Sequence, residues 1–97
     1  MMHNVRELKI WKGSRELVSE NYKTTKQFPA DELYGLTSQI RRCSVSIPAN
    51  ISEDCGRTIT KELIRFLDIA NGSAFELETL LIIANDLNYL NSNDIRD

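Results

Sequence analysis

The residues with the most evident chemistry are five cations around the middle of the chain. They are Arg41, Arg42, Arg57, Lys61 and Arg65. An arginine guanidinium binds a carboxylate or a phosphate through two parallel hydrogen bonds, so the set fits either structural ion pairs or a nucleic-acid-binding face. Because consecutive helical residues point about 100° apart, Arg41 and Arg42 face different directions. One of them suits the rim of a helix interface, paired with Glu76 or Glu78, and the other suits the surface.

No group of residues in the sequence fits acid–base or nucleophilic catalysis. Four serines in the predicted helices lack a histidine that could activate them, namely Ser38, Ser44, Ser46 and Ser73. Glu76 and Glu78 are two positions apart and therefore lie on different faces of a helix. The sequence has neither a Glu-x-x-His metal motif nor a glycine-rich phosphate loop. We therefore expect no enzyme activity and no cofactor.

The two cysteines, Cys43 and Cys55, are twelve positions apart in one predicted helix. That separation is about 18 Å along the helix axis, whereas the Cα atoms of a disulfide lie within roughly 7 Å. An internal bridge is therefore excluded unless the helix breaks. With a single histidine, His3, the cysteines form no zinc ligand set, so we expect buried or half-buried thiols and no metal.

Charge is distributed unevenly along the chain. Residues 1–65 carry a net charge of +3 and residues 66–97 a net charge of −5. Binding to nucleic acid would therefore need a local basic face, because the bulk charge does not favour it. No apolar run approaches the 18 or so residues of a membrane span, and the N-terminus lacks the apolar centre of a secretion signal. We expect a cytoplasmic protein without membrane contact.

Apolar residues recur every three or four positions in three long segments. This predicts helices at about 4–27, 34–55 and 59–88, in a single domain that spans 1–97. The predicted stripe of the first is Leu8, Trp11, Arg15, Val18, Tyr22 and Thr25. The predicted stripe of the second is Leu36, Ile40, Cys43, Ile47 and Ile51. The third has two adjacent stripes, which indicates more than one neighbour, and a fourth helix is expected to start near 93.

Pro48 stands inside the second predicted helix. It removes a backbone donor and crowds the carbonyl of Ser44, so we expect a bend there. The hydroxyls of Ser44 and Ser46 are candidates to satisfy the freed carbonyl.

Several motifs together resemble one known family. They are LKIWKGSRELV near the start, YGL-x-SQ-x-RR, SIPANI-x-E and GR in the middle, and E-x-x-RFL-x-IA-x-GS-x-x-E-x-E after them. The chain is similar, from about Leu8 to Asp94, to the small proteins encoded within intervening sequences of bacterial large-subunit rRNA genes. It departs from the family's pattern at Asp54 and Cys55, where relatives commonly have glycine and an aromatic residue, and in lacking a full fourth helix.

The resemblance implies an all-α, antiparallel, up-down-up-down four-helix bundle, with the fourth helix truncated or missing in this chain. It also implies a homo-oligomer, a pentamer in relatives. The accessory proteins of diversity-generating retroelements are a related group that binds a reverse transcriptase and nucleic acid.

Two hypotheses of function follow. In the first, a non-catalytic oligomeric bundle binds structured RNA or DNA, or a nucleic-acid-processing partner, through a basic face of the first two helices. In the second, the bundle is a protein–protein scaffold whose broad apolar third helix docks subunits or a partner protein.

Overall fold

The structure, a computed structural model, describes residues 9–55 and 60–90, except the side chains of residues 54, 55, 60–64 and 66. Within these ranges there is no strand, and the all-α class is confirmed. The elements in chain order are α1 (Lys9–Thr25), the 3-10 helix η2 (Ala30–Glu32), α2 (Leu36–Cys55) and α3 (Thr60–Asp86). Among these elements, no helix is long and apolar enough to cross a membrane.

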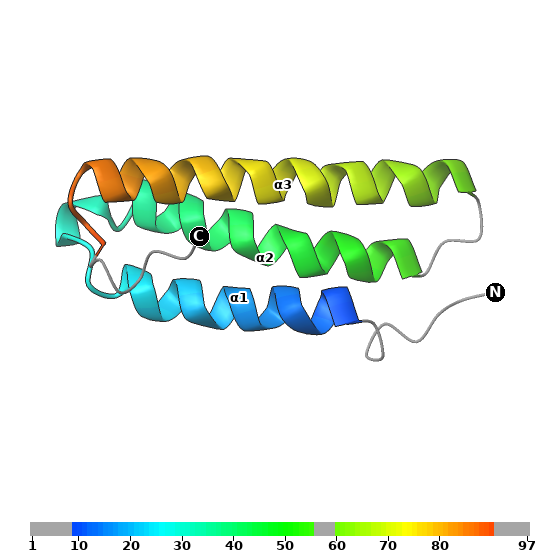
Figure 1. Cartoon of the computed structure of the whole chain (residues 1–97), viewed down its shortest axis with the longest axis horizontal. Helices are drawn as coiled ribbons and strands as arrows, with labels where there is room; N and C mark the ends of the chain where they lie inside the picture. The colour runs from blue at the N-terminus through cyan, green and yellow to red at the C-terminus, as the bar shows by residue number, and fades with distance from the viewer. Residues whose placement is uncertain (1–8, 56–59, 91–97) are drawn as a thin grey trace.

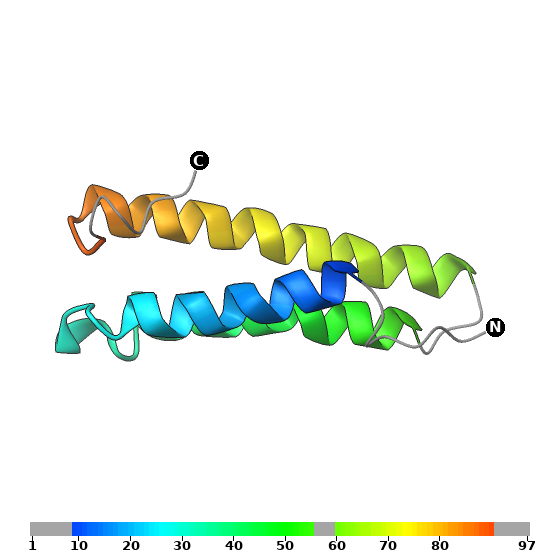
Figure 2. The ribbon, with the colours of Figure 1, turned by 60° about the horizontal axis from the view of Figure 1, so that its bottom comes forward.

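Helix α2 is the central element of the arrangement. It packs against α1 on one side and α3 on the other, while α1 and α3 make little direct contact (Figures 1 and 2). Each helix runs antiparallel to the one before it, as in an up-down bundle (Figure 1). The expected start of a fourth helix near 93 lies outside the described residues.

The core is a continuous apolar cluster between α2 and its two neighbours. From α2 it takes all five residues of the predicted stripe, each at most 8% exposed: Leu36, Ile40, Cys43, Ile47 and Ile51. From the rest of the chain it takes Phe28, Ala70, Leu77, Leu80 and Ala84. The side chain of Ile40 is completely buried at its centre. Burial of this one face explains the 3.6-residue periodicity of α2.

Helix α1 faces the core with part of the expected stripe, since Thr25 is buried and Trp11 packs against the core cluster. Its buried residues are Ser14, Asn21 and Thr25, whereas Arg15 and Tyr22 are exposed. The prediction that Arg15 and Tyr22 belong to the buried stripe was therefore wrong. Short polar side chains occupy those places because two of them bond to their own helix: Ser14 Oγ donates to the carbonyl of Trp11 at 2.9 Å, and Thr25 Oγ1 to that of Asn21 at 2.7 Å.

Glu32 fixes the corner between α1 and α2. Its Oε1 accepts the backbone N–H of Leu36 at 3.3 Å, at the first residue of α2. This places a carboxylate at a helix N-terminus, where it meets unpaired N–H groups and the positive end of the helix dipole. A Cβ at Gly35 would lie 2.6 Å from the same oxygen, so the glycine leaves room for the carboxylate to reach back.

The C-terminal end of α3 is closed by a left-handed residue. Asn88 has φ 62°, and the N–H of Tyr89 donates to the carbonyl of Ala84 at 2.9 Å. The N–H of Asn88 donates to Asn85 at 3.0 Å, which completes a Schellman-type cap with asparagine in the place of the usual glycine. The cap directs Tyr89 onto Phe28, with their ring centroids 5.5 Å apart.

Pro48 lies inside a helix that continues on both sides of it. The hydroxyls of Ser44 and Ser46 were expected to donate to the free carbonyl of Ser44, but they bond elsewhere. Ser44 Oγ donates to the carbonyl of Arg41 at 3.1 Å, and Ser46 Oγ donates to that of Cys43 at 2.7 Å. Each hydroxyl reaches the carbonyl three residues before it, which is the local bond that serine makes most readily in a helix.

Candidate functional site

Arg41 bridges α2 and α1. Its Nε donates to Thr25 Oγ1 at 2.9 Å, and an Nη2 hydrogen is directed to the carbonyl of Tyr22 at 3.5 Å. The guanidinium lies over the ring of Tyr22, 4.7 Å from the ring centroid. This combination of a hydrogen bond with a cation–π contact holds the side chain in one orientation while part of the cation stays accessible.

Glu76, one of the two carboxylates expected to pair with one of the adjacent arginines, bonds to Cys43. Its Oε2 accepts a hydrogen bond from Cys43 Sγ at 3.1 Å, and the same thiol lies 3.0 Å from the carbonyl of Ser73. The interface contacts of Arg41 are with Thr25 and Tyr22 of α1. Arg41 lies on the side of α2 that faces α1, whereas Cys43 faces α3, because residues two apart on a helix diverge.

The thiol of Cys43 is not a nucleophile at neutral pH. Burial raises its pKa to about 12, and the hydrogen bond and negative charge of Glu76 act in the same direction. Next to it, the hydroxyl oxygens of Ser46 and Ser73 lie 2.6 Å apart, and this hydrogen bond joins α2 to α3. These polar groups form a structural link between the two helices, and the protonated thiol within it is unreactive. Within the described ranges, no cluster of three or more acidic, histidine or cysteine side chains could hold a metal ion.

The other predicted cations are not gathered around Arg41. Arg42 is exposed on the outside of α2, so the adjacent arginines do face different directions. Arg65 is also exposed, but it precedes Ser73, the residue level with Cys43, by eight positions, or about 12 Å along α3. Arg57 and the side chain of Lys61 lie outside the described residues.

A second set of cations lies on α1 and just after it, and two of its members, Lys23 and Lys26, follow directly on Tyr22 and Thr25, the residues that Arg41 contacts. Lys12, Arg15, Lys23 and Lys26 are all exposed. Lys12 and Lys23 are eleven residues apart, as are Arg15 and Lys26, and eleven residues are about three helical turns. Lys12 and Lys23 therefore lie on one line along α1 and Arg15 on a neighbouring line, while Lys26 follows the last residue of the helix. We call Lys12, Arg15, Lys23, Lys26 and Arg41 the basic stripe.

The basic stripe runs beside a part of α2 that has no carboxylate. Residues 36–52 contain two arginines and no Asp or Glu. Of the acidic residues in the described chain, Asp68, Glu76, Glu78 and Asp86 are on α3, while α1 carries Glu16 and Glu20, which lie within about one turn of Lys12 and Lys23. Arg15 is held at 4.8 Å over the ring of Trp11, as Arg41 is over Tyr22. The α1–α2 side therefore combines positive charge with two aromatic rings.

The sequence contains the signal for the basic stripe. The spacing of three, eight and three residues among its α1 members and Lys26 is visible without a structure. The prediction from sequence placed a basic face on the first two helices but chose its cations from the second helix onward, because two adjacent arginines are the more conspicuous pattern.

Comparison with known proteins agrees with the resemblance described above. No curated protein matches the sequence. The family model described as 23S rRNA-intervening sequence protein matches residues 6–97, nearly the whole chain. The chain belongs to the 23S rRNA-intervening sequence protein family.

Proposed function

We propose that this protein is a non-catalytic helical-bundle protein of the cytoplasm that binds structured RNA or DNA along the basic stripe. The observation that carries the proposal is the alignment of five cations from α1, the turn after it and α2, on a side whose α2 residues 36–52 lack carboxylates. Lysine and arginine contacts to phosphates supply most of the affinity of proteins for nucleic acid.

The dimensions of the stripe suit a phosphate backbone. Lys12 and Lys23 are separated by about 16 Å along α1, and duplex DNA carries about one charge per 1.7 Å of its axis. The stripe therefore faces several phosphates at once. Arg41 is held in place by Thr25 and Tyr22, so it loses little conformational freedom when it binds.

A pair of matched variants tests the proposal. Lys12→Gln with Lys23→Gln removes two charges from the stripe, and Arg42→Gln with Arg65→Gln removes two exposed charges elsewhere. Fluorescence anisotropy with a structured RNA is expected to show weaker binding for the first double variant only. Equal weakening by both would show that net charge acts without the stripe. Weakening by the second alone would favour the cations first nominated from the sequence.

A second candidate function is association through α3. This helix exposes large apolar side chains along its length, namely Leu67, Ile69, Phe75, Ile82 and Ile83, and Leu87 directly after it is exposed as well. Exposed apolar area of this kind favours a protein interface, and the resemblance points to a homo-oligomer, a pentamer in relatives. The two functions are compatible, because the basic stripe lies on α1 and α2. Light scattering that shows a monomer at micromolar concentration would contradict this second function.

A further inference from the structure

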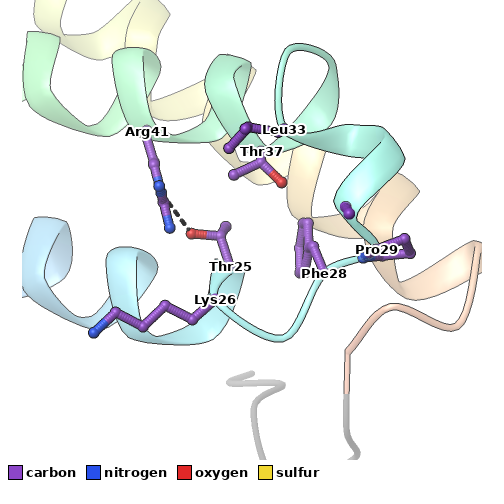
Figure 3. A pocket seen from close by; sticks show the side chains of 8 residues that line it. Thr25, Lys26, Phe28, Pro29, Leu33, Thr37 and Arg41 are labelled. Atoms are coloured by element: carbon purple, nitrogen blue, oxygen red, sulfur yellow. Dashed lines mark hydrogen bonds between the residues drawn. The ribbon is translucent and has the colours of Figure 1, made fainter.

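A small open cavity lies at the corner where α1 ends and α2 begins, and Lys26 and Arg41 of the basic stripe line it (Figure 3). Its volume is about 380 Å³. Thr25 and Lys26 line it from the end of α1, Phe28 and Leu33 from the connection, and Thr37 and Arg41 from α2. Ligand sites in proteins range from about 300 to 1,000 Å³, so this one suits a short ligand.

The charged groups of the cavity are both cations. Its lining includes Lys26 and Arg41 and no carboxylate. Arg41 directs Nε to Thr25, as the dashed line in Figure 3 shows, and its guanidinium has further N–H groups. A planar guanidinium with free N–H groups matches the two oxygens of a carboxylate.

Thr37 supplies a second polar group, which has no partner. Its side chain is 3% exposed, and in the described part of the chain no hydrogen bond to its hydroxyl is found. The hydroxyl points into the cavity, on the same face of α2 as Arg41 one turn later (Figure 3). Thr25, Ser14 and Ser44 differ, because each donates to a carbonyl of its own helix. In the described chain only the Asn21 amide nitrogen is a buried side-chain polar atom without a partner, so the Thr37 hydroxyl oxygen is accessible from the cavity and available to a ligand atom.

The remaining wall of the cavity is apolar and firmly placed. Phe28 is 7% exposed and is held from behind by the ring of Tyr89, 5.5 Å away. Leu33 is 49% exposed and lies beside Thr37 (Figure 3). An apolar group that enters beside Arg41 would therefore contact both side chains.

We propose that this corner cavity binds a small organic carboxylate with a short apolar body. The carboxylate accepts hydrogen bonds from Arg41 and from the hydroxyl of Thr37, with Lys26 adding positive charge at the edge. The apolar body packs against Phe28 and Leu33. The site shares Lys26 and Arg41 with the basic stripe and differs from a phosphate contact in its apolar wall, because a nucleic-acid backbone has no apolar group to fill that wall.

Titration of isotope-labelled full-length protein with benzoate, followed by amide chemical shifts, tests the proposal. Benzoate is expected to give saturable shifts around Thr37 and Arg41. Acetate, inorganic phosphate and benzyl alcohol each lack part of the required chemistry, and they are expected to bind at least about tenfold more weakly. Equal binding of phosphate and benzoate would overturn the apolar part of the proposal, and absence of saturable shifts with benzoate would overturn all of it.

Thr37→Val is the decisive variant, because it keeps the shape of the side chain and removes only the hydroxyl. It is expected to weaken benzoate binding about tenfold, the usual effect of a hydrogen bond to a charged group. Leu33→Ala changes an exposed residue of the wall and is expected to weaken benzoate more than acetate. Arg42→Gln, on the outside of α2, is the matched control for charge and is expected to change nothing. Unchanged affinity in Thr37→Val would overturn the proposal, whatever the result with RNA.

Discussion

Tyr89 and Glu32, 57 residues apart in the sequence, are joined by a hydrogen bond of 3.0 Å from the tyrosine hydroxyl to Oε2 of the carboxylate. The other oxygen of Glu32 accepts the N–H of Leu36 at the start of α2. One carboxylate therefore ties the segment after α3 to the corner between α1 and α2. This link closes one end of the helix arrangement.

The Tyr89–Glu32 link predicts an unusual tyrosine titration. The hydrogen bond to the Glu32 carboxylate, together with burial, raises the pKa of Tyr89 above its ordinary value of 10.0. Folding thus favours the protonated phenol, and this contribution is lost as the pH rises above the ordinary tyrosine range. Ultraviolet titration of the phenolate should show a late step that is absent from Tyr89→Phe and shifted down in Glu32→Gln. A late step that persists in Tyr89→Phe would contradict the assignment.

Asn21 predicts a stabilising substitution. It is 5% exposed, and its Nδ2 is buried without a hydrogen-bond partner in the described part of the structure. An unpaired buried donor costs about 1–3 kcal/mol, so Asn21→Leu, of similar size, is expected to raise the free energy of unfolding by about 1 kcal/mol or more. Urea unfolding measures the change. Asn71→Leu, at an exposed position of α3, is the control and should stay within about 0.5 kcal/mol of the wild type. Destabilisation by Asn21→Leu would show that the amide is needed.

Cys43 is predicted to resist thiol reagents. Burial and Glu76 raise its pKa from 9.0 to about 12, which leaves roughly a thousandfold less thiolate at neutral pH. Alkylation followed by peptide mass spectrometry should find Cys43 unmodified in the native protein and modified after denaturation. Between about pH 9 and 12 the unfolded thiol ionises before the folded one, so stability falls with rising pH. Cys43→Ala should abolish the part of this loss of stability that comes from ionisation of the thiol. Rapid native alkylation would contradict the buried position.

Phe75 is predicted to support self-association. It is 70% exposed on α3, among other apolar side chains of that helix. If α3 forms the interface, Phe75→Ser should shift sedimentation equilibrium toward smaller species, because a buried phenylalanine contributes about 1.5–3 kcal/mol. Tyr34→Ser, at an aromatic residue that is 92% exposed near the α1–α2 corner, is the control and should leave the native mass unchanged. An unchanged native mass in Phe75→Ser would show that α3 does not form the interface at this position.

Local periodicity predicted the face of α2 that forms the core, from Leu36 to Ile51, because one apolar stripe there meets both neighbours. Periodicity predicted the buried face of α1 less well, because Ser14 and Asn21 are buried there and a pattern of apolar residues does not include polar ones. The divergence of Arg41 and Arg42 followed from helix geometry. The contacts of Arg41 with Thr25 and Tyr22 could not be predicted from helix geometry, because these residues come close only through the packing of α1 on α2. The contact of Glu32 with Tyr89 likewise depends on the whole fold.

The salt dependence of RNA binding tests the central claim most directly. Five phosphate contacts from the basic stripe predict that the logarithm of the association constant falls with the logarithm of salt concentration at a slope of about −4. The variant with Lys12→Gln and Lys23→Gln should reduce the magnitude of this slope by about two, whereas the variant with Arg42→Gln and Arg65→Gln should keep it. An unchanged slope in the first variant, or an equal reduction in both, would contradict binding along the stripe.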